Sequence, residues 1–265
     1  MAGPLSLLRR IVLAALTLVC AFLMALAAAA QEDGADPPRS AFQRLLDRNA
    51  IPYRVPPVGK AILVNIPAFE LVTFQDGTPV FRSKVIVGTP WNRTPRLRTY
   101  TTAVRFRPTW RPTPSMIASG EYRDRVWPAG PSNPLGLAAV RMQPGLLVYM
   151  HDTNHRELFE REERALSHGC IRVHRWDDLV AWVLDMPLAE VHAHANGTRT
   201  FDAPAPPIPV RLGYFTLFPD ADGQIVQHGD IYNLGRFGEA APKPGSEVIA
   251  KASLDQPLSC GSSGG

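Results

Sequence analysis

Two alternating apolar runs joined by Asp76-Gly77 constrain the fold of this chain most strongly. Asp-Gly favours a two-residue hairpin turn, because both central residues of that turn take positive φ, and the flanking runs have the period-two pattern of strands. The runs that read as strands are 61–66, 69–74, 78–87, 101–106, 146–150 and 170–173. Successive strands joined by short turns pair antiparallel. The sequence therefore predicts a mainly β fold of the β-sandwich type, with a few short helices.

Two segments have apolar residues at helical spacing. Ser40 is a favoured N-cap residue and precedes a short amphipathic segment, Ala41 to Arg48. The segment from Trp176 to Met186 has Asp177 and Asp178 in its first turn, where the helix dipole favours acidic side chains. We expect one short helix before the strands and one packed helix after them.

The first thirty residues have the pattern of a secretory signal. Arg9 and Arg10 precede an apolar run from Ile11 to Ala30, which ends in small residues before polar ones. The run is also long enough to span a bilayer, so an N-terminal anchor is the alternative to cleavage after Ala30. Either reading predicts export to the periplasm or cell envelope.

The most specific chemical feature is a central thiol between polar neighbours, in the segment from Ser167 to Arg172. Gly169 lets the backbone turn sharply before Cys170, so that the amides of Gly169 and Cys170 can face a carbonyl oxygen. His151 ends an apolar strand and can serve as the base that a thiol needs. These parts together indicate a cysteine acyltransferase.

The same residues carry a family resemblance. His151, a spacer of fifteen residues and Ser167-His168-Gly169-Cys170 resemble the signature of the L,D-transpeptidases with a YkuD-type catalytic domain. Further segments that resemble this domain are 62–71, 85–90 and 130–136, and their amino-acid sequences are most similar to those of the YcbB-like branch. The segment between Pro108 and Pro134 is a shortened form of that branch's capping segment, which predicts a more open cleft.

The resemblance implies a YkuD-like β-sandwich and a role for each site residue. Cys170 is the nucleophile, and His151 is the base, oriented by the backbone carbonyl of Asp152. The oxyanion and support residues are His168, Gly169, Asp152 and Ser167. The substrate-binding residues are Arg172, which suits a carboxylate, with Tyr149, Trp127 and Asn133.

We expect five segments along the chain. They are a signal peptide or anchor (1–30), a linker with a short helix (31–58), the catalytic domain (59–200), a C-terminal strand extension packed on that domain (201–234) and a flexible tail (235–265). The expected partners are peptidoglycan stem peptides, as acyl donor and acceptor. No cofactor, metal or nucleic acid is expected, and the protein is expected to be a monomer without a stable membrane span once the signal is cleaved. A formal charge of +4 suits an anionic wall polymer.

Several alternatives remain open from the sequence. The acceptor could give 3-3 or 1-3 cross-links, a wall-protein attachment, D-amino acid exchange, or hydrolysis by an L,D-carboxypeptidase or amidase. A noncatalytic wall-binding module would keep the cleft without turnover. His151, His168 and Cys170 could also ligate zinc, although no fourth ligand stands at a recognisable spacing. Cys260 is either an incidental surface thiol or a regulatory bridge to Cys170.

Overall fold

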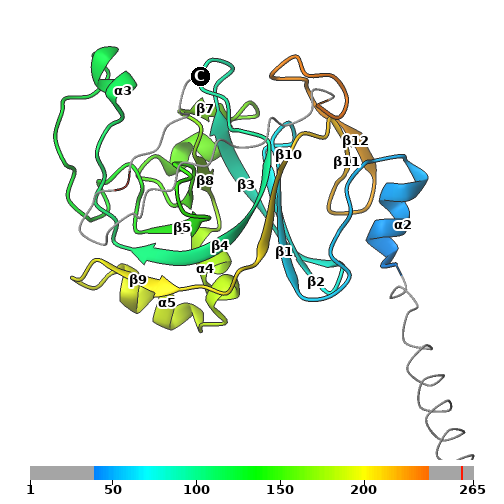
Figure 1. The fold of residues 1–265 in the computed structure, drawn as a ribbon, viewed down its shortest axis with the longest axis horizontal. Helices are drawn as coiled ribbons and strands as arrows, with labels where there is room; N and C mark the ends of the chain where they lie inside the picture. The colour runs from blue at the N-terminus through cyan, green and yellow to red at the C-terminus, as the bar shows by residue number, and fades with distance from the viewer. Residues whose placement is uncertain (1–38, 239–257, 259–265) are drawn as a thin grey trace, which may run out of the picture. The chain divides into compact units, whose positions relative to one another are not determined.

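The computed structural model describes residues 39–238 and Leu258 (Figure 1). Its helices are α2 (Ala41–Arg48), α3 (Pro114–Ala118), the 3-10 helix η2 (Arg156–Glu160), α4 (Trp176–Leu184) and α5 (Leu188–Ala195). Its strands are β1 (Lys60–Asn65), β2 (Glu70–Gln75), β3 (Thr78–Gly88), β4 (Leu97–Phe106), β5 (Ala138–Met142), β6 (Met150–His151), β7 (Ala165–Ser167), β8 (Ile171–Val173), β9 (Phe201–Pro204), β10 (Pro209–Gly213), β11 (Leu217–Pro219) and β12 (Ile225–Gln227).

Ten of these strands form one sheet that closes on itself. The order is β10-β1-β2-β3-β8-β6-β5-β4-β9, and β7 pairs with β3. β10 pairs with both β1 and β4, so the hydrogen bonding runs from one part of this path back to the other. A closed sheet leaves few unpaired strand edges. The prediction of a mainly β fold with a few short helices is confirmed, and the closure through β10 is a feature that the sequence did not indicate.

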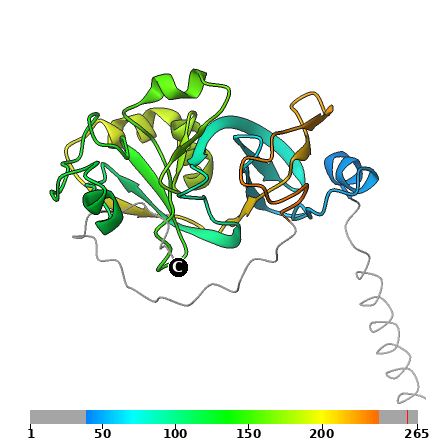
Figure 2. The same ribbon diagram turned by 90° about the horizontal axis from the view of Figure 1, so that it is seen from above.

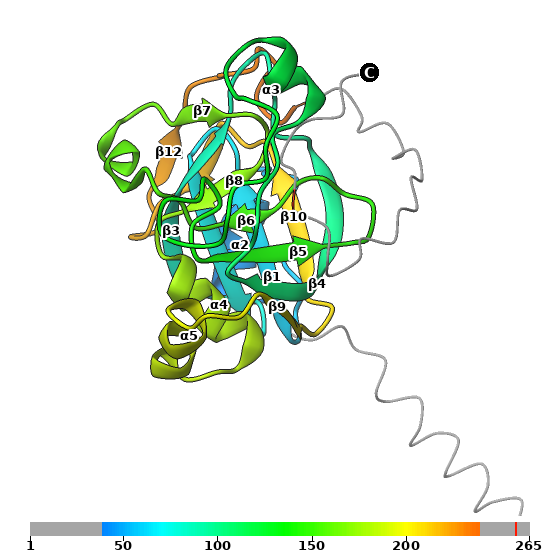
Figure 3. The ribbon, with the colours of Figure 1, turned by 90° about the vertical axis from the view of Figure 1, so that its left-hand side faces the viewer.

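Strand β1 is buried on both faces and separates two apolar clusters. Ile62 and Val64 belong to the main core, while Ala61 and Leu63 belong to a second cluster. This alternation follows from the period of two along a strand. The main core takes buried side chains from most strands of the closed sheet and from α4 and α5, which lie side by side next to it (Figures 1 and 3).

The second cluster joins α2 to the sheet. Leu46 is fully buried there, and the Phe42 ring lies 5.3 Å from Phe74 and 5.9 Å from Phe218. Gln43 accepts a hydrogen bond from the Val55 amide at 2.8 Å, which ties the helix to the segment after it. In Figures 1 and 2 the blue α2 lies beside the orange β11–β12 hairpin. The part of the predicted linker from residue 39 onward is therefore packed on the sheet.

Several local predictions are confirmed. The helix from Ala41 to Arg48 forms with Ser40 as its N-cap, whose hydroxyl accepts from the Gln43 amide at 3.1 Å. The hairpin turns at Asp76 and Gly77, which both have positive φ. The helix after the Cys170 strand begins at Trp176 as expected.

The segment boundaries after residue 200 stay a prediction. Residues 201–213, expected as a strand extension packed on the domain, supply β9, which pairs with β4, and β10, which pairs with β1 and β4. The tail from 235 is not loose at Leu258, which is 2% exposed. Its amide donates to the Thr109 carbonyl at 3.0 Å, and its carbonyl accepts from the Arg111 amide at 3.0 Å.

The N-terminal predictions fall on undescribed residues. The signal peptide or anchor at 1–30 and most of the tail lie outside residues 39–238 and Leu258. Within the described part, no helix combines the length and the apolar character that crossing a membrane would require.

Candidate active site

Two neighbouring parallel strands bring His151 and Cys170 to one cavity. Met150 of β6 lies opposite Ile171 of β8, and the Ile171 amide donates to the Tyr149 carbonyl at 2.9 Å. His151 ends β6, and Cys170 directly precedes β8. Both residues line a cavity of about 30 Å³. Strand pairing therefore closes the sequence gap between them, as predicted.

The Cys170 sulfur is buried and bonded. The residue is 2% exposed, and the Tyr149 amide donates to Sγ at 3.3 Å. A backbone donor at this position would stabilise a thiolate. In this structure the sulfur is in a disulfide bond. The Leu147 carbonyl lies 3.6 Å from Sγ, a contact that becomes a hydrogen bond only when the sulfur carries a proton. Nucleophilic chemistry at Cys170 therefore requires prior reduction of this bond.

The backbone fixes the orientation of His151. Its Nδ1–H donates to the carbonyl of Asp152, as the resemblance implied. This bond leaves Nε2 as the nitrogen that can accept a proton. Burial lowers the pKa of His151 to about 3, with the charge of Arg172 adding to the effect and the carbonyls of Asp152 and Leu135 opposing it. The imidazole is therefore neutral at neutral pH, the form that a general base needs.

The buried imidazole predicts a pH dependence of stability. Because the folded-state pKa of about 3 lies below the ordinary value of 6.5, the unfolded chain binds a proton that the folded chain does not. The free energy of unfolding should then fall from pH 6.5 toward pH 3, with a slope from this group of up to about 1.4 kcal/mol per pH unit. Urea unfolding of the wild type and of His151→Gln between pH 7 and pH 4 measures the difference. Parallel curves for the two proteins would contradict it.

Asp152 anchors the turn beneath His151. Its carboxylate accepts from the Leu137 amide at 3.0 Å and from Arg156 at 2.8 Å. Burial raises the pKa of Asp152, while the amides of Thr153 and Leu137 and the charge of Arg156 lower it and do not fully compensate. Gly136 has φ of +62°, and a Cβ there would lie 2.3 Å from a carboxylate oxygen of Asp152. The close approach of the two chain segments therefore requires glycine at 136.

Ser167 holds the turn that presents Cys170. Its hydroxyl donates to the Cys170 carbonyl at 2.6 Å and accepts from the Gly169 amide at 3.1 Å. Gly169 has φ of +110°, a conformation that side-chain-bearing residues rarely adopt. Because the Gly169 amide already donates to Ser167, it is not directed at a substrate carbonyl in this structure. An oxyanion hole formed by the amides of His168 and Cys170 stays a prediction.

A buried hydrogen-bond network supports this turn from behind, and the sequence analysis missed it. The Thr94 hydroxyl donates to the Gly169 carbonyl at 2.9 Å and accepts from the Gly88 amide at 2.8 Å. The Thr94 amide donates to the Tyr232 hydroxyl at 3.1 Å. The Tyr232 amide in turn donates to the hydroxyl of Tyr214 at 2.8 Å. No local pattern marks these residues, because each contact joins segments far apart in sequence.

The cavity wall carries a positive charge. Arg172 lines the cavity together with His168 and Tyr122. Burial lowers the pKa of Arg172, but a guanidinium titrates so far above neutral pH that it stays charged. His168 Nε2 lies 2.9 Å from a carboxylate oxygen of Glu121. Arg172 therefore puts a positive charge on the cavity wall, and its contact with a substrate carboxylate stays a prediction, while His168 is within ion-pair distance of a carboxylate.

The other predicted substrate contacts have different surroundings. Tyr149 is 5% exposed and packs in an apolar cluster with Cys170. Trp127 is not among the residues that line the cavity, and its ring lies 6.1 Å from Trp110. Asn133 is fully buried, with its amide nitrogen donating to the Pro108 carbonyl at 3.0 Å. Asn133 therefore clamps the loop, and we assign it no substrate contact.

The described residues form a small cavity around Cys170, and not the open cleft expected from a short capping segment. The cavity of about 30 Å³ has room for roughly one water molecule. Trp110, Met116 and Leu258 pack in the same apolar cluster as Cys170. The described residues form no group of three or more His, Cys, Asp or Glu side chains that could hold a metal ion.

Comparisons with known proteins find L,D-transpeptidases. The chain is 29% identical over 225 aligned residues to a putative L,D-transpeptidase of Haemophilus influenzae, which covers 69% of this chain and 46% of the relative. It is 33% identical over 130 residues to the probable L,D-transpeptidase YbiS of Escherichia coli, covering 45% of this chain and 40% of the relative. The chain thus spans less than half the length of these relatives.

Solved structures give weaker matches. An L,D-transpeptidase from Mycobacterium smegmatis aligns at 22% identity with a TM-score of 0.35, covering 58% of each chain. L,D-transpeptidase 1 of Mycobacterium tuberculosis aligns at 16% identity with a TM-score of 0.34, covering 58% of this chain and 61% of that one.

The family model gives the decisive match. The model of the YkuD L,D-transpeptidase catalytic domain matches residues 59–210, which is more than half of the chain. The match includes His151, Cys170 and the strands that pair beside them. It does not distinguish the YcbB-like branch from others, so that branch remains a prediction. The chain belongs to the L,D-transpeptidases with a YkuD catalytic domain.

Proposed function

We propose that the reduced protein is a peptidoglycan L,D-transpeptidase in which Cys170 is the nucleophile and His151 is the base. The observation that supports this most directly is the shared cavity of the two side chains, with the Tyr149 amide donating to Sγ at 3.3 Å. Membership of the family supplies the substrate class. The predicted export of the chain would place it with that substrate in the cell envelope.

The first half-reaction transfers an acyl group to the enzyme. His151 Nε2 takes the proton of Cys170, and the thiolate attacks the carbonyl carbon between the third residue of a donor stem peptide and D-Ala. The amides of His168 and Cys170 stabilise the oxyanion. The carbon–nitrogen bond then breaks, and the D-Ala amine leaves with the proton held by His151. The products are a thioester on Cys170 and D-Ala.

The second half-reaction transfers the acyl group to an amine. An amine of a second stem peptide attacks the thioester carbon and gives a proton to His151, and the sulfur leaves as the thiolate. A new amide bond results, in a 3-3 or 1-3 cross-link according to which residue supplies the amine. Arg172 would hold a carboxylate of one stem by paired hydrogen bonds.

The test is incubation of the reduced full chain with purified disaccharide tetrapeptides, followed by mass spectrometry. We expect cross-linked dimers that have lost one D-Ala. Cys170→Ala should give none, while Cys260→Ser, which keeps the nucleophile, should match the reduced wild type. Tripeptides without dimers would reassign the chain to an L,D-carboxypeptidase. Equal products from Cys170→Ala, or none from a folded, reduced wild type, would refute the function.

A further inference from the structure

One loop holds two carbonyls of the turn that presents the nucleophilic sulfur. The loop covers residues 89–96, between β3 and β4. Its Thr89 amide donates to the Ser167 carbonyl at 2.9 Å, and its Thr94 hydroxyl donates to the Gly169 carbonyl at 2.9 Å. Thr94 is 1% exposed, and a hydrogen bond in such a buried position is stronger than one in water. The β3–β4 loop therefore fixes the direction of both carbonyls.

The direction of these carbonyls also fixes the direction of two amides. A peptide unit is planar, and in the trans form its C=O and N–H point in opposite directions. The described part of the chain has no cis peptide bond. The Ser167 carbonyl shares its peptide unit with the His168 amide, and the Gly169 carbonyl shares its unit with the Cys170 amide. Both amides, which are the predicted oxyanion donors, are therefore directed away from the β3–β4 loop.

The same hydrogen bonds make the two amides better donors. A carbonyl that accepts a hydrogen bond polarises its own peptide unit, so that the N–H of that unit donates more strongly. The Thr94 hydroxyl therefore acts on the Cys170 amide in two ways, through its direction and through its polarity. In this way a side chain that does not touch the substrate can influence the stability of an oxyanion.

Tyr232 ties the two ends of the β3–β4 loop together. Its hydroxyl donates to the Gly88 carbonyl at 2.6 Å and accepts from the Thr94 amide at 3.1 Å. The Gly88 amide in turn donates to the Thr94 hydroxyl at 2.8 Å. A Cβ at Gly88 would overlap the Asn92 carbonyl oxygen, so the close approach of the two ends requires glycine. The Thr94 hydroxyl is thus held between its donor and the carbonyl that it supports.

Tyr232 is itself held in one position. It is 1% exposed, and its ring stacks on that of Tyr214 with the centres 5.7 Å apart. Its amide donates to the Tyr214 hydroxyl at 2.8 Å, and that hydroxyl donates to the Asp230 carboxylate at 2.5 Å. The Arg93 guanidinium lies 5.3 Å from the Tyr232 ring centre, within the range of a cation–π contact. The family match ends at residue 210, so this support comes from outside the matched domain.

We propose that Thr94 and Tyr232 are positioning residues for acyl transfer: Thr94 directs the Cys170 amide toward the oxyanion, and Tyr232 holds Thr94 in place. The inference rests on the proposed function, because it concerns the oxyanion of that same reaction. Neither residue lines the cavity that Cys170 shares with His151, so both act through the backbone of the turn.

Two reactions of the Cys170 thiolate separate this role from general support of the fold. Attack on an ester carbonyl forms a tetrahedral oxyanion, which the amide donors stabilise. Attack on the CH₂ carbon of iodoacetamide breaks the carbon–iodine bond and releases iodide, and no oxyanion forms at the carbonyl. A variant that has lost only the orientation of the donors should therefore be slow in the first reaction and normal in the second.

The test follows both reactions on the full chain, after reduction and removal of the reductant, by mass spectrometry of the Cys170 peptide. The ester is p-nitrophenyl acetate, which loses p-nitrophenolate and leaves an acetyl thioester on the sulfur. Thr94→Val keeps the shape of the side chain without its hydroxyl and should slow acylation by about 10- to 100-fold. Thr94→Ser should restore most of the rate, and Tyr232→Phe should slow acylation in the same direction. Alkylation by iodoacetamide should be unchanged in all three variants.

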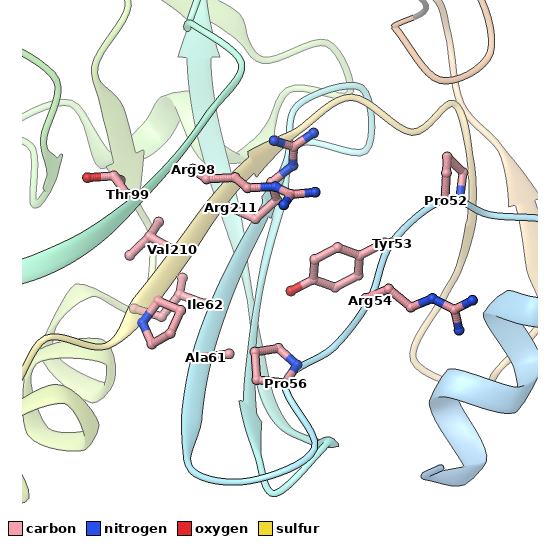
Figure 4. A pocket seen from close by; sticks show the side chains of 11 residues that line it. Pro52, Tyr53, Arg54, Pro56, Ala61, Ile62, Arg98, Thr99, Val210 and Arg211 are labelled. Carbon is pink, nitrogen blue, oxygen red and sulfur yellow. The ribbon is translucent and has the colours of Figure 1, made fainter. Parts of the chain in front are cut away.

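Two matched controls come from a separate cavity of about 290 Å³, which Figure 4 shows. Tyr53→Phe removes a tyrosine hydroxyl from a buried residue. Thr99→Val removes a buried threonine hydroxyl that has no hydrogen-bond partner among the described residues. This cavity and the catalytic one have no lining residue in common. Both controls should acylate and alkylate at the wild-type rates.

Several results would overturn the positioning role. They are a wild-type acylation rate in Thr94→Val, equal losses of acylation and alkylation, and a Thr94→Ser variant as slow as Thr94→Val. With disaccharide tetrapeptides, Thr94→Val should lower kcat and leave KM unchanged. The ester needs no peptidoglycan, so the two proposals can fail separately. If Thr94→Val selectively slows acylation by the ester while the reduced wild type makes no product from tetrapeptides, the proposed function fails and the positioning role stands. If Thr94→Val cross-links tetrapeptides at the wild-type rate, the reverse holds.

Discussion

Replacement of His151 by glutamine is expected to lower kcat/KM of the reduced protein by about 10²–10⁴-fold, the range for loss of a general base. The imidazole is fixed by its Nδ1–H bond to the Asp152 carbonyl, and it lines the same cavity as Cys170. Glutamine can fill much of this space but cannot take the thiol proton and later return it to an amine. Both half-reactions therefore lose the same group.

The rate of Cys170 alkylation against pH tests this role separately from turnover. In the reduced wild type the neutral imidazole can accept the thiol proton as the sulfur attacks the alkylating agent, so alkylation near neutral pH should be faster than in His151→Gln, whose rate should follow thiolate formation at about 8.5. His155→Ala is the matched control, because that side chain is 57% exposed and pairs with Glu157. His168→Gln tests the second-choice base. Unchanged profiles for His151→Gln, with a loss for His168→Gln, would transfer the base role to His168.

Local signals in the sequence were sufficient wherever a structure depends on neighbouring residues. The helix from Ala41 to Arg48 needed only its Ser40 cap and its apolar spacing. The β2–β3 hairpin needed only Asp76 and Gly77, whose positive φ angles the turn requires. These features are decided within a few residues, so a pattern in the chain contains the necessary information.

Structures that depend on distant partners could not be predicted in the same way. Helix α5 begins after Pro187 without a side-chain cap and buries Val191 and Ala195, too few apolar positions to give a clear helical pattern. Strand β10 closes the sheet by pairing with β1 and β4, which precede it by more than a hundred residues. The expected strand extension over 201–234 included this segment, but nothing in the segment specified its two neighbours.

In the candidate site too, features that depend on a local motif were predicted, and features that depend on distant contacts were not. The signature from His151 to Cys170 predicted the pair that shares the cavity, and the parallel pairing of β6 with β8 is what brings the two residues together. Thr94 was missed, since its contact with the Gly169 carbonyl spans 75 positions. The burial of Leu258 against the site was also missed, because a tail rich in glycine and serine gives no sign of a docking residue. The prediction of a more open cleft was therefore wrong.

Removal of the Asp202 carboxylate is the change in the scaffold with the largest expected effect. Asp202 of β9 accepts from Arg105 of β4 at 2.6 and 2.9 Å and from Arg141 of β5 at 2.5 Å. The Arg105 side chain is 1% exposed. Asp202 therefore neutralises guanidinium groups from two adjacent strands, one of them buried. Strand β5 also pairs with β6, with Ala139 opposite His151, so this anion supports the strand that carries the base.

Asp202→Ala should lower the free energy of unfolding by about 3–5 kcal/mol, because it removes the counterion of a buried charge. Burial alone raises the pKa of Asp202, but hydrogen bonds and charges from Arg105 and Arg141 bring it below the ordinary 3.8. The carboxylate thus stabilises the fold at pH above 3.8, and its contribution is lost as pH falls through the folded-state pKa. Urea unfolding followed by tryptophan fluorescence measures the loss at pH 7, and the difference in the free energy of unfolding between wild type and variant should narrow in acid.

Glu160→Ala is the control: it removes the exposed partner of Lys84 and should lower the free energy of unfolding by less than about 1 kcal/mol. A similar small cost for Asp202→Ala would show that the buried arginine is stabilised by other groups.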